Sequence, residues 1–134
     1  MLTGMLGYLQ GTSRSDISMA THQCACFNLC QKLCHERAVK SICKYLLNTN
    51  NKNIIFQPDP KKGIECHVDA DFSGGWASGE HYNPEAVLSC TSFVISYAGC
   101  PTYLCIKIQT EICLSKTEAE YVALSIAMRE VLPF

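Results

Sequence analysis

Hydrophobic positions recur every three or four residues through much of the first half of the chain, which predicts amphipathic helices. One apolar stripe begins after the polar run 13–16 and continues to Phe27. A second helix is expected over 33–47, and the asparagine-rich run 48–53 ends it because asparagine favours turns over helix interiors. A short strand is expected at 53–56. The first half is therefore predicted to be mainly helical.

The pattern changes to strict alternation after Gly63, which predicts β-strands. The run 58–63 contains two prolines and marks the expected boundary between the two parts of the chain. Three strands joined by short connections form an antiparallel meander, and a helix with a capping-box spacing at Ser115 and Glu118 follows them. The expected strands are 64–70, 87–97 and 102–113, and the expected helix is 117–132.

These elements predict an α+β chain in two parts. Residues 1–57 form a helical segment, and residues 63–134 form a truncated domain in which a three-stranded meander precedes a helix. The segment 72–85 holds three glycines and a proline, so it is expected to be irregular. No run of eighteen apolar residues occurs and the start of the chain lacks a basic lead-in, so we expect no membrane span and an intracellular, non-secreted protein.

Charge is unevenly divided along the chain. Residues 1–62 carry eight Lys and Arg against three acids, a net +5, whereas residues 63–134 carry three against nine, a net −6. A basic half beside an acidic half suits a surface for a nucleic-acid backbone joined to a metal site, and it equally suits two solvated faces without a partner. The candidate nucleic-acid-binding residues lie on one side of the helix 33–47: Arg37, Lys40 and Lys44.

Two acidic segments about fifty residues apart are the candidate catalytic and metal-binding elements. Asp69 stands at the end of a predicted strand, and Glu120 stands near the start of the last predicted helix. Hydrolysis of a phosphodiester by two metal ions needs several carboxylates around Mg²⁺. Glu120 is preferred to Glu118 because it falls on the helix face of Leu124 and Ala127, which we expect to be buried. A buried carboxylate is costly unless it is paired or metal-bound.

Asp71 and Trp76 follow Asp69 in the same segment. Asp71 is the weaker candidate and is interpreted as a solvated loop residue. Trp76 lies in a glycine-rich loop, where it either stacks on a base or ribose or covers the core, and the second interpretation is slightly favoured.

Ten cysteines need a separate account. In a chain without an export signal they are expected to be reduced thiols. Cys26, Cys30 and Cys34 are spaced to line one helical face after His22, which would suit a soft metal ion. The favoured alternative is scattered thiols that act as small hydrophobic residues, because zinc sites usually draw their ligands from two elements.

Four segments of the second half share a pattern with a known family. They are Asp-Ala-Asp-Phe-Ser-Gly-Gly-Trp (69–76), Thr-Ser-Phe-Val-Ile-Ser-Tyr-Ala-Gly-Cys-Pro (91–101), Lys107-x-Gln109 and Leu-Ser-Lys-Thr-Glu-Ala-Glu-Tyr-Val-Ala-Leu-Ser (114–125). Together they resemble the ribonuclease H domain of copia-type retrotransposon Pol polyproteins. The first half is similar to the thumb-and-connection end of the preceding reverse transcriptase. The segments that carry this similarity are Gly7-Tyr-Leu, Arg14-Ser-Asp-Ile and His35-Glu-Arg-Ala-Val-Lys-x-Ile-Cys-Lys-Tyr-Leu.

The resemblance implies an activity and a site. Asp69 matches the first catalytic aspartate of the family and Glu120 its catalytic glutamate, with Mg²⁺ as cofactor and the RNA strand of an RNA–DNA hybrid as substrate. The implied fold is a five-stranded mixed sheet flanked by helices. The third and fourth catalytic carboxylates of the family lie beyond Phe134.

From this we expect a fragment of a Pol polyprotein that is weakly active or inactive alone. Its expected partners are an RNA–DNA hybrid or other nucleic acid, and the rest of the polyprotein. The alternative is a non-catalytic nucleic-acid-binding or structural remnant of a transposable element.

Overall fold

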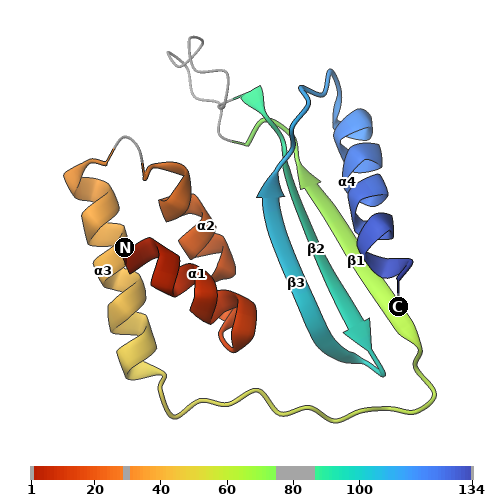
Figure 1. The fold of residues 1–134 in the computed structure, drawn as a ribbon, viewed down its shortest axis with the longest axis horizontal. Coiled ribbons are helices and arrows are strands. Elements are labelled where there is room, and N and C mark those ends of the chain that lie inside the picture. Colours follow the sequence, from red (N-terminus) through yellow and green to blue (C-terminus); the bar gives the residue numbers. More distant parts are fainter. Residues whose placement is uncertain (1, 29–30, 75–86, 134) are drawn as a thin grey trace. The chain divides into compact units, whose positions relative to one another are not determined.

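The computed structural model describes residues 2–28, 31–74 and 87–133. The chain forms two compact units, which we call the helical unit (Met1–Phe56) and the sheet unit (Gln57–Phe134) (Figure 1). Within the described ranges, no helix combines the length and the apolar character needed to cross a membrane.

The described regular elements of the helical unit are all helices. In chain order they are α1 (Leu2–Thr12), the 3-10 turn η1 (Ser15–Ile17), α2 (Ser18–Cys26) and α3 (Leu33–Asn48). Each contributes one buried apolar side chain to a single core cluster, formed by Leu6, Ile17, Cys24 and Ile42. The predicted helix 33–47 is confirmed, and α2 corresponds to the apolar stripe that was expected to begin after 13–16.

Two features of the helical unit differ from the prediction. The helix α1 was not predicted, because Gly4, Gly7 and Gly11 weaken helix propensity and interrupt the apolar spacing. Its packing through the buried Leu6 outweighs that weakness. The predicted strand at 53–56 is wrong, because no described strand pairs with this segment and Ile55 is 81% exposed.

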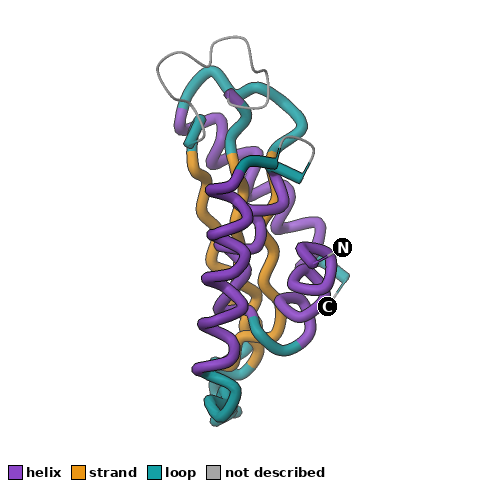
Figure 2. Tube along the Cα trace, turned by 90° about the vertical axis from the view of Figure 1, so that its left-hand side faces the viewer, coloured by secondary structure: helices purple, strands orange, loops and turns teal. Residues whose placement is uncertain are grey.

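A three-stranded antiparallel sheet and one helix make up the sheet unit. The strands are β1 (Ile64–Asp71), β2 (Cys90–Tyr97) and β3 (Cys100–Ile108), and the helix is α4 (Lys116–Val131). The order across the sheet is β1-β2-β3, and the strands run side by side in both views (Figures 1 and 2). The prediction of an α+β chain with an antiparallel meander followed by a helix is confirmed.

The β2–β3 hairpin turns on two residues with positive φ, Ala98 at 52° and Gly99 at 76°. Two consecutive positive φ values are typical of the type I′ turn, whose twist matches that of the paired strands. The prediction extended the third strand to residue 113, but β3 ends at Ile108. The chain leaves the sheet there because the side chain of Gln109 turns into the interior, where it is 2% exposed.

The helix α4 packs on the sheet through small residues. Ala119 and Ala123 are fully buried and Ala127 is 1% exposed, so alanines spaced four residues apart form the contact face. Ala127 shares a core cluster with Phe93 and Ile95 of β2. Because alanine lacks a long side chain, this face lets the helix approach the strands closely.

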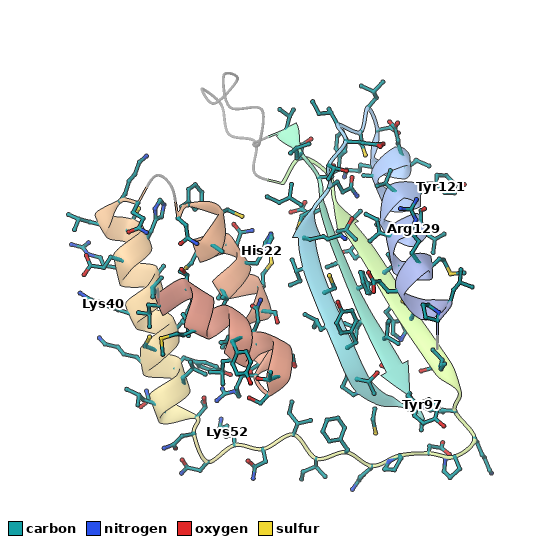
Figure 3. All side chains as sticks on the ribbon, in the orientation of Figure 1. His22, Lys40, Lys52, Tyr97, Tyr121 and Arg129 are labelled. Atoms are coloured by element: carbon teal, nitrogen blue, oxygen red, sulfur yellow. The ribbon has the colours of Figure 1, made fainter. Side chains whose placement is uncertain are left out.

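The predicted buried face of α4 is correct at Ala127 and wrong at three other positions. Glu120, Leu124 and Met128 were expected on the buried face, but all three are exposed, the two apolar residues at 47% and 46%. Tyr121 also projects away from the sheet (Figure 3). The pattern search favoured large apolar residues, whereas the close helix–sheet contact selects the small ones one position earlier.

Candidate functional site

Strand β1 ends where helix α4 begins, at one end of the sheet unit (Figure 1). A chain of contacts fixes this arrangement. Ala70 of β1 pairs with Thr91 of β2. The Nε2 amide of Gln109 donates to Thr91 Oγ1 at 2.9 Å and to the carbonyl oxygen of Ala119 in α4 at 2.9 Å. The end of the sheet and the first turns of α4 are thus tied together.

The two candidate catalytic residues are the sequence neighbours of the residues at the two ends of this chain of contacts. Asp69 precedes Ala70 and Glu120 follows Ala119, so both lie at the same end of the sheet unit, and both are exposed. Side chains alternate along β1, and Val68 packs in the core with α4. Asp69 therefore points to the sheet face opposite α4, two residues before the strand ends.

The physical reason given for choosing Glu120 is wrong, since the side chain is exposed and incurs no burial cost. The proposed capping role of Glu118 is confirmed by two hydrogen bonds. Glu118 Oε2 accepts from the amide of Leu114 at 2.6 Å, and Ser115 Oγ accepts from the amide of Glu118 at 3.1 Å. Within the described ranges no hydrogen bond or ion pair involves the Glu120 carboxylate, which lies one turn into α4, so Glu120 differs from Glu118 by position and not by burial.

The side chain of Asp71 packs against the turn that follows β1. A Cβ atom at Gly74 would overlap the Asp71 carboxylate, so the two residues lie in close contact and a side chain at position 74 would displace that carboxylate. Ser73, with a positive φ of 50°, donates its amide to Ser89 Oγ at 3.4 Å. Asp71 therefore packs against its own turn, and Asp69 remains the better placed of the two aspartates. Trp76 and its two interpretations lie outside the described residues.

The chemistry of Asp69 and Glu120 suits Mg²⁺, which prefers hard oxygen ligands and tolerates retained waters. Their number does not complete a site. In the part of the chain that the structure describes, no three His, Cys, Asp or Glu side chains come together in a way that could hold a metal ion. The two carboxylates are therefore candidates for part of a metal centre.

The cysteine alternative gains no support within the described ranges. Cys26 and Cys34 are exposed, Cys30 lies outside those ranges, and Cys26 Sγ is 3.9 Å from His22 Nε2 on the same helix. These side chains form no described cluster of three metal ligands.

A buried polar network beside the candidate site was not foreseen. Ser89, Thr91 and Gln109 are 0–2% exposed, although all three are polar. The Sγ of Cys113 donates to Gln109 Oε1 at 3.0 Å, and burial raises the pKa of the Cys113 thiol. A glutamine between a strand and a helix is ordinarily expected at the surface. The only sequence feature that singles out Gln109 is the Lys107-x-Gln109 segment of the family resemblance.

The helical unit contains a second polar cluster, built on Arg14 and Asp16. The guanidinium donates to both carboxylate oxygens, at 2.9 and 2.8 Å, and also to Thr49 Oγ1 at 2.7 Å. Tyr45 donates its hydroxyl to Asp16 at 2.9 Å. The hydrogen bond from Arg14 is the main reason that the pKa of Asp16 falls to about 2. This cluster ties η1 to the C-terminal end of α3.

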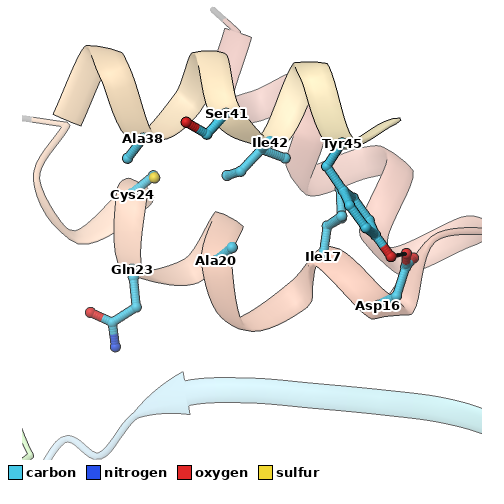
Figure 4. A pocket seen from close by; sticks show the side chains of 9 residues that line it. All are labelled: Asp16, Ile17, Ala20, Gln23, Cys24, Ala38, Ser41, Ile42 and Tyr45. Carbon is cyan, nitrogen blue, oxygen red and sulfur yellow. Dashed lines mark hydrogen bonds between the residues drawn. The ribbon is translucent and has the colours of Figure 1, made fainter. Parts of the chain in front are cut away.

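A pocket of about 520 Å³ lies in the helical unit beside the same cluster (Figure 4). Its walls come from η1, α2 and α3 and are mainly apolar, including Ile17, Ala20 and Ile42. The Asp16 carboxylate at its edge is already bonded to Tyr45 and Arg14. The pocket thus brings no free acid or base together with its apolar walls.

The three candidate nucleic-acid-binding residues, Arg37, Lys40 and Lys44, are all exposed on α3. Lys40 points outward from the helix (Figure 3) and its Nζ is 2.5 Å from Glu36 Oε1. The ion pair offsets part of the positive charge on this face.

Comparisons of the chain with protein-family models, with curated proteins and with solved structures give no match.

Proposed function

We propose that the sheet unit is part of a ribonuclease H-type domain and that the chain is a fragment of a copia-type retrotransposon Pol polyprotein. Asp69 and Glu120 then supply two of the carboxylates that bind Mg²⁺ for cleavage of the RNA strand of an RNA–DNA hybrid inside the cell. The observation that carries the proposal is the shared end of the sheet unit, where β1 finishes, α4 starts and Gln109 joins them.

The exposure of both carboxylates supports this function, because a phosphodiester in a duplex has to reach the metal from solvent. When bound, Mg²⁺ ions supply the charge that stabilises the attacking and leaving oxygens. Two carboxylates are too few to offset that charge and orient the ions. The site therefore needs further carboxylates, which the resemblance to the family places beyond Phe134, and we expect weak or no cleavage by this chain alone.

The packing of α4 supports an extension of the sheet beside β1. The helix contacts mainly β1 and contacts β2 less (Figure 1). No described strand pairs with the outer edge of β1. A helix buries most apolar surface when strands lie on both sides of its axis. A further strand along β1 would centre α4 over the sheet and could bring a carboxylate beside Asp69.

The helical unit fits the proposed role as the end of a reverse transcriptase. The Arg14-Ser-Asp-Ile segment that carries the resemblance has a physical task here, because Arg14 and Asp16 pair and Ile17 is 2% exposed in the core. These contacts give the segment a structural role that does not require any of its residues to be catalytic.

Incubation of the purified chain with a labelled RNA–DNA hybrid and Mg²⁺ tests the proposal. We expect cleavage no greater than that of Asp69→Asn. Glu130→Gln is the matched control for Glu120→Gln, because both residues are exposed on α4. Robust Mg²⁺-dependent cleavage that Asp69→Asn and Glu120→Gln abolish, and Glu130→Gln does not, would show a complete nuclease and contradict the proposed incompleteness.

A second candidate function is nucleic-acid binding without chemistry through the exposed Arg37, Lys40 and Lys44. Lysine and arginine contacts to phosphates give binding that weakens as salt rises. The double variant Lys40→Ala/Lys44→Ala should bind a hybrid more weakly and with a smaller salt dependence. Lys61→Ala/Lys62→Ala removes the same charge from another exposed segment and serves as the control. Equal binding by both double variants rules out this surface.

A further inference from the structure

The segment 53–58 lies at the boundary between the helical unit and the sheet unit. It connects α3 to β1 as neither helix nor strand (Figure 1), and every residue from 50 to 65 is exposed. Within the described ranges, no hydrogen bond involves any residue of 53–58. The backbone of this segment is therefore hydrogen-bonded to water alone.

The chain on either side of the segment is held by hydrogen bonds. Toward the helical unit, the amide of Lys52 donates to the carbonyl oxygen of Thr49 at 3.1 Å, and Thr49 is 7% exposed. Toward the sheet unit, the amide of Asp59 donates at 2.9 Å to the carbonyl oxygen of Ala98 in the β2–β3 turn. The part of the connection without hydrogen bonds is thus confined to the residues between these two anchors.

Three consecutive large apolar side chains are exposed in this segment, Ile54 at 52%, Ile55 at 81% and Phe56 at 56%. Pro58 restricts Gln57 to extended conformations and cannot donate to a strand partner, so the run cannot lengthen into a regular strand. Extended peptides are recognised through main-chain hydrogen bonds and through pockets for alternate side chains, which is how an endopeptidase holds its substrate. The segment offers both features without any structure that has to unfold first.

We propose that the segment 53–58 is a proteolytic processing site, cut by an endopeptidase that prefers large apolar side chains. Water is added across the amide bond between Ile55 and Phe56, which leaves a carboxylate on Ile55 and an amine on Phe56. Each unit has its own core cluster, so cleavage releases two folded units. This cleavage requires no nuclease activity in the chain and is independent of the proposed ribonuclease H function.

Limited digestion of the full chain with thermolysin tests the proposal, because this enzyme cuts on the amino side of large apolar residues. Leu124 is the internal control, since its side chain is 47% exposed, close to the 52% of Ile54, but its backbone lies within α4. Mass spectrometry of early fragments gives the cleavage rate at each bond. We expect cuts before Ile55 and Phe56 at least about tenfold faster than the cut before Leu124, because a helix has to open locally before a protease can bind it.

Amide hydrogen exchange after the cut tests the release of two folded units. Protection in α1–α3, in β1–β3 and in α4 should stay as it was in the intact chain. Equal cleavage rates at Ile55 and Leu124 would overturn the proposal. Cleavage at 53–58 that is slow and speeds up on dilution would also overturn it, because it would show the segment covered by a second copy. Loss of protection in either unit after the cut would contradict their release as folded units.

A triple variant separates the cleavage site from a structural role of the same side chains. Ile54→Asp/Ile55→Asp/Phe56→Asp removes the apolar side chains, all of which are exposed. It should lose the early cut and keep the melting temperature and the amide protection of both units. A lowered melting temperature would show that these side chains stabilise the fold and would contradict their assignment as a recognition segment.

Discussion

The two units of this chain hold their elements together with polar clusters of opposite character. In the helical unit, Arg14 and Asp16 form a charged pair whose side chains stay 17% and 36% exposed. In the sheet unit, the tie through Gln109 and Thr91 is neutral and almost completely buried. Charged groups need solvent to offset their desolvation, whereas a neutral amide can be buried once its hydrogen bonds are made.

The difference indicates where each unit is sensitive to change. Water can replace partners in the helical cluster, so substitutions there should cost little. Around Gln109, a lost partner leaves a buried polar atom without a hydrogen bond. The unit that carries the candidate carboxylates is thus expected to be the less tolerant of polar substitutions.

The largest effect is expected from the apolar core of the sheet unit. Phe93→Ala should lower the free energy of unfolding by about 3–5 kcal/mol, because it removes a large side chain that is 2% exposed and leaves a cavity. Amide hydrogen exchange measures the result unit by unit. Protection should fall in β1–β3 and α4 and be retained in α1–α3. Equal loss in both units would contradict their description as separate compact units.

A smaller effect is expected when the buried network around Gln109 loses one hydrogen-bond acceptor. Thr91→Val keeps the shape of the side chain but leaves one Nε2 hydrogen of Gln109 unpaired, at a cost of about 1–3 kcal/mol. Thr102→Val is the control, because Thr102 is exposed although it donates to the Ile95 carbonyl oxygen at 3.0 Å. Urea unfolding should separate the two variants. Equal midpoints would show that burial of the network has no energetic importance.

Acid should weaken the charged cluster of the helical unit. The pKa of Asp16 lies at about 2, below its ordinary value of 3.8, mainly because of the hydrogen bond from Arg14. A lowered pKa in the folded state stabilises the fold above the ordinary value, and this contribution is lost as pH falls from about 4 to about 2. Thermal melts of α1–α3 signals should show this slope in wild type and lack it in Asp16→Asn. The same slope in both proteins would remove Asp16 as its source.

The smallest effect is expected on the outer face of α3. Lys40→Ala breaks the pair with Glu36, one turn earlier on the same helix, and should change the free energy of unfolding very little because both groups are exposed. High salt should reduce the difference between variant and wild type. A cost as large as that of Thr91→Val would mean that Lys40 has contacts beyond this pair.

Periodicity predicted the elements with a strong local pattern, including β1, β2, α3 and α4. It missed α1, where three glycines interrupt the apolar spacing while tertiary packing of Leu6 stabilises the helix. It also predicted a strand at 53–56 from local β propensity, although a strand needs a hydrogen-bonding partner that local sequence does not reveal.

The candidate site was only partly predictable for the same reason. The alternation along β1 and the capping spacing located Asp69 and the first turn of α4. The buried face of α4 was only partly predicted, because Ala119 and Ala123 carry little hydrophobic signal although they are fully buried. The role of Gln109 depends on residues ten and eighteen positions away, and no local pattern reports such a tie.

We propose that Asp69 and Glu120 belong to a larger ribonuclease H-type site, and the resemblance to the family places its remaining carboxylates beyond Phe134. The most direct measurement is to sequence the transcript past the codon for Phe134. We expect the reading frame to continue into a strand-forming segment that ends in aspartate and can pair with the edge of β1 that no described strand occupies. A stop codon directly after Phe134, or a continuation without an acidic strand, would contradict it.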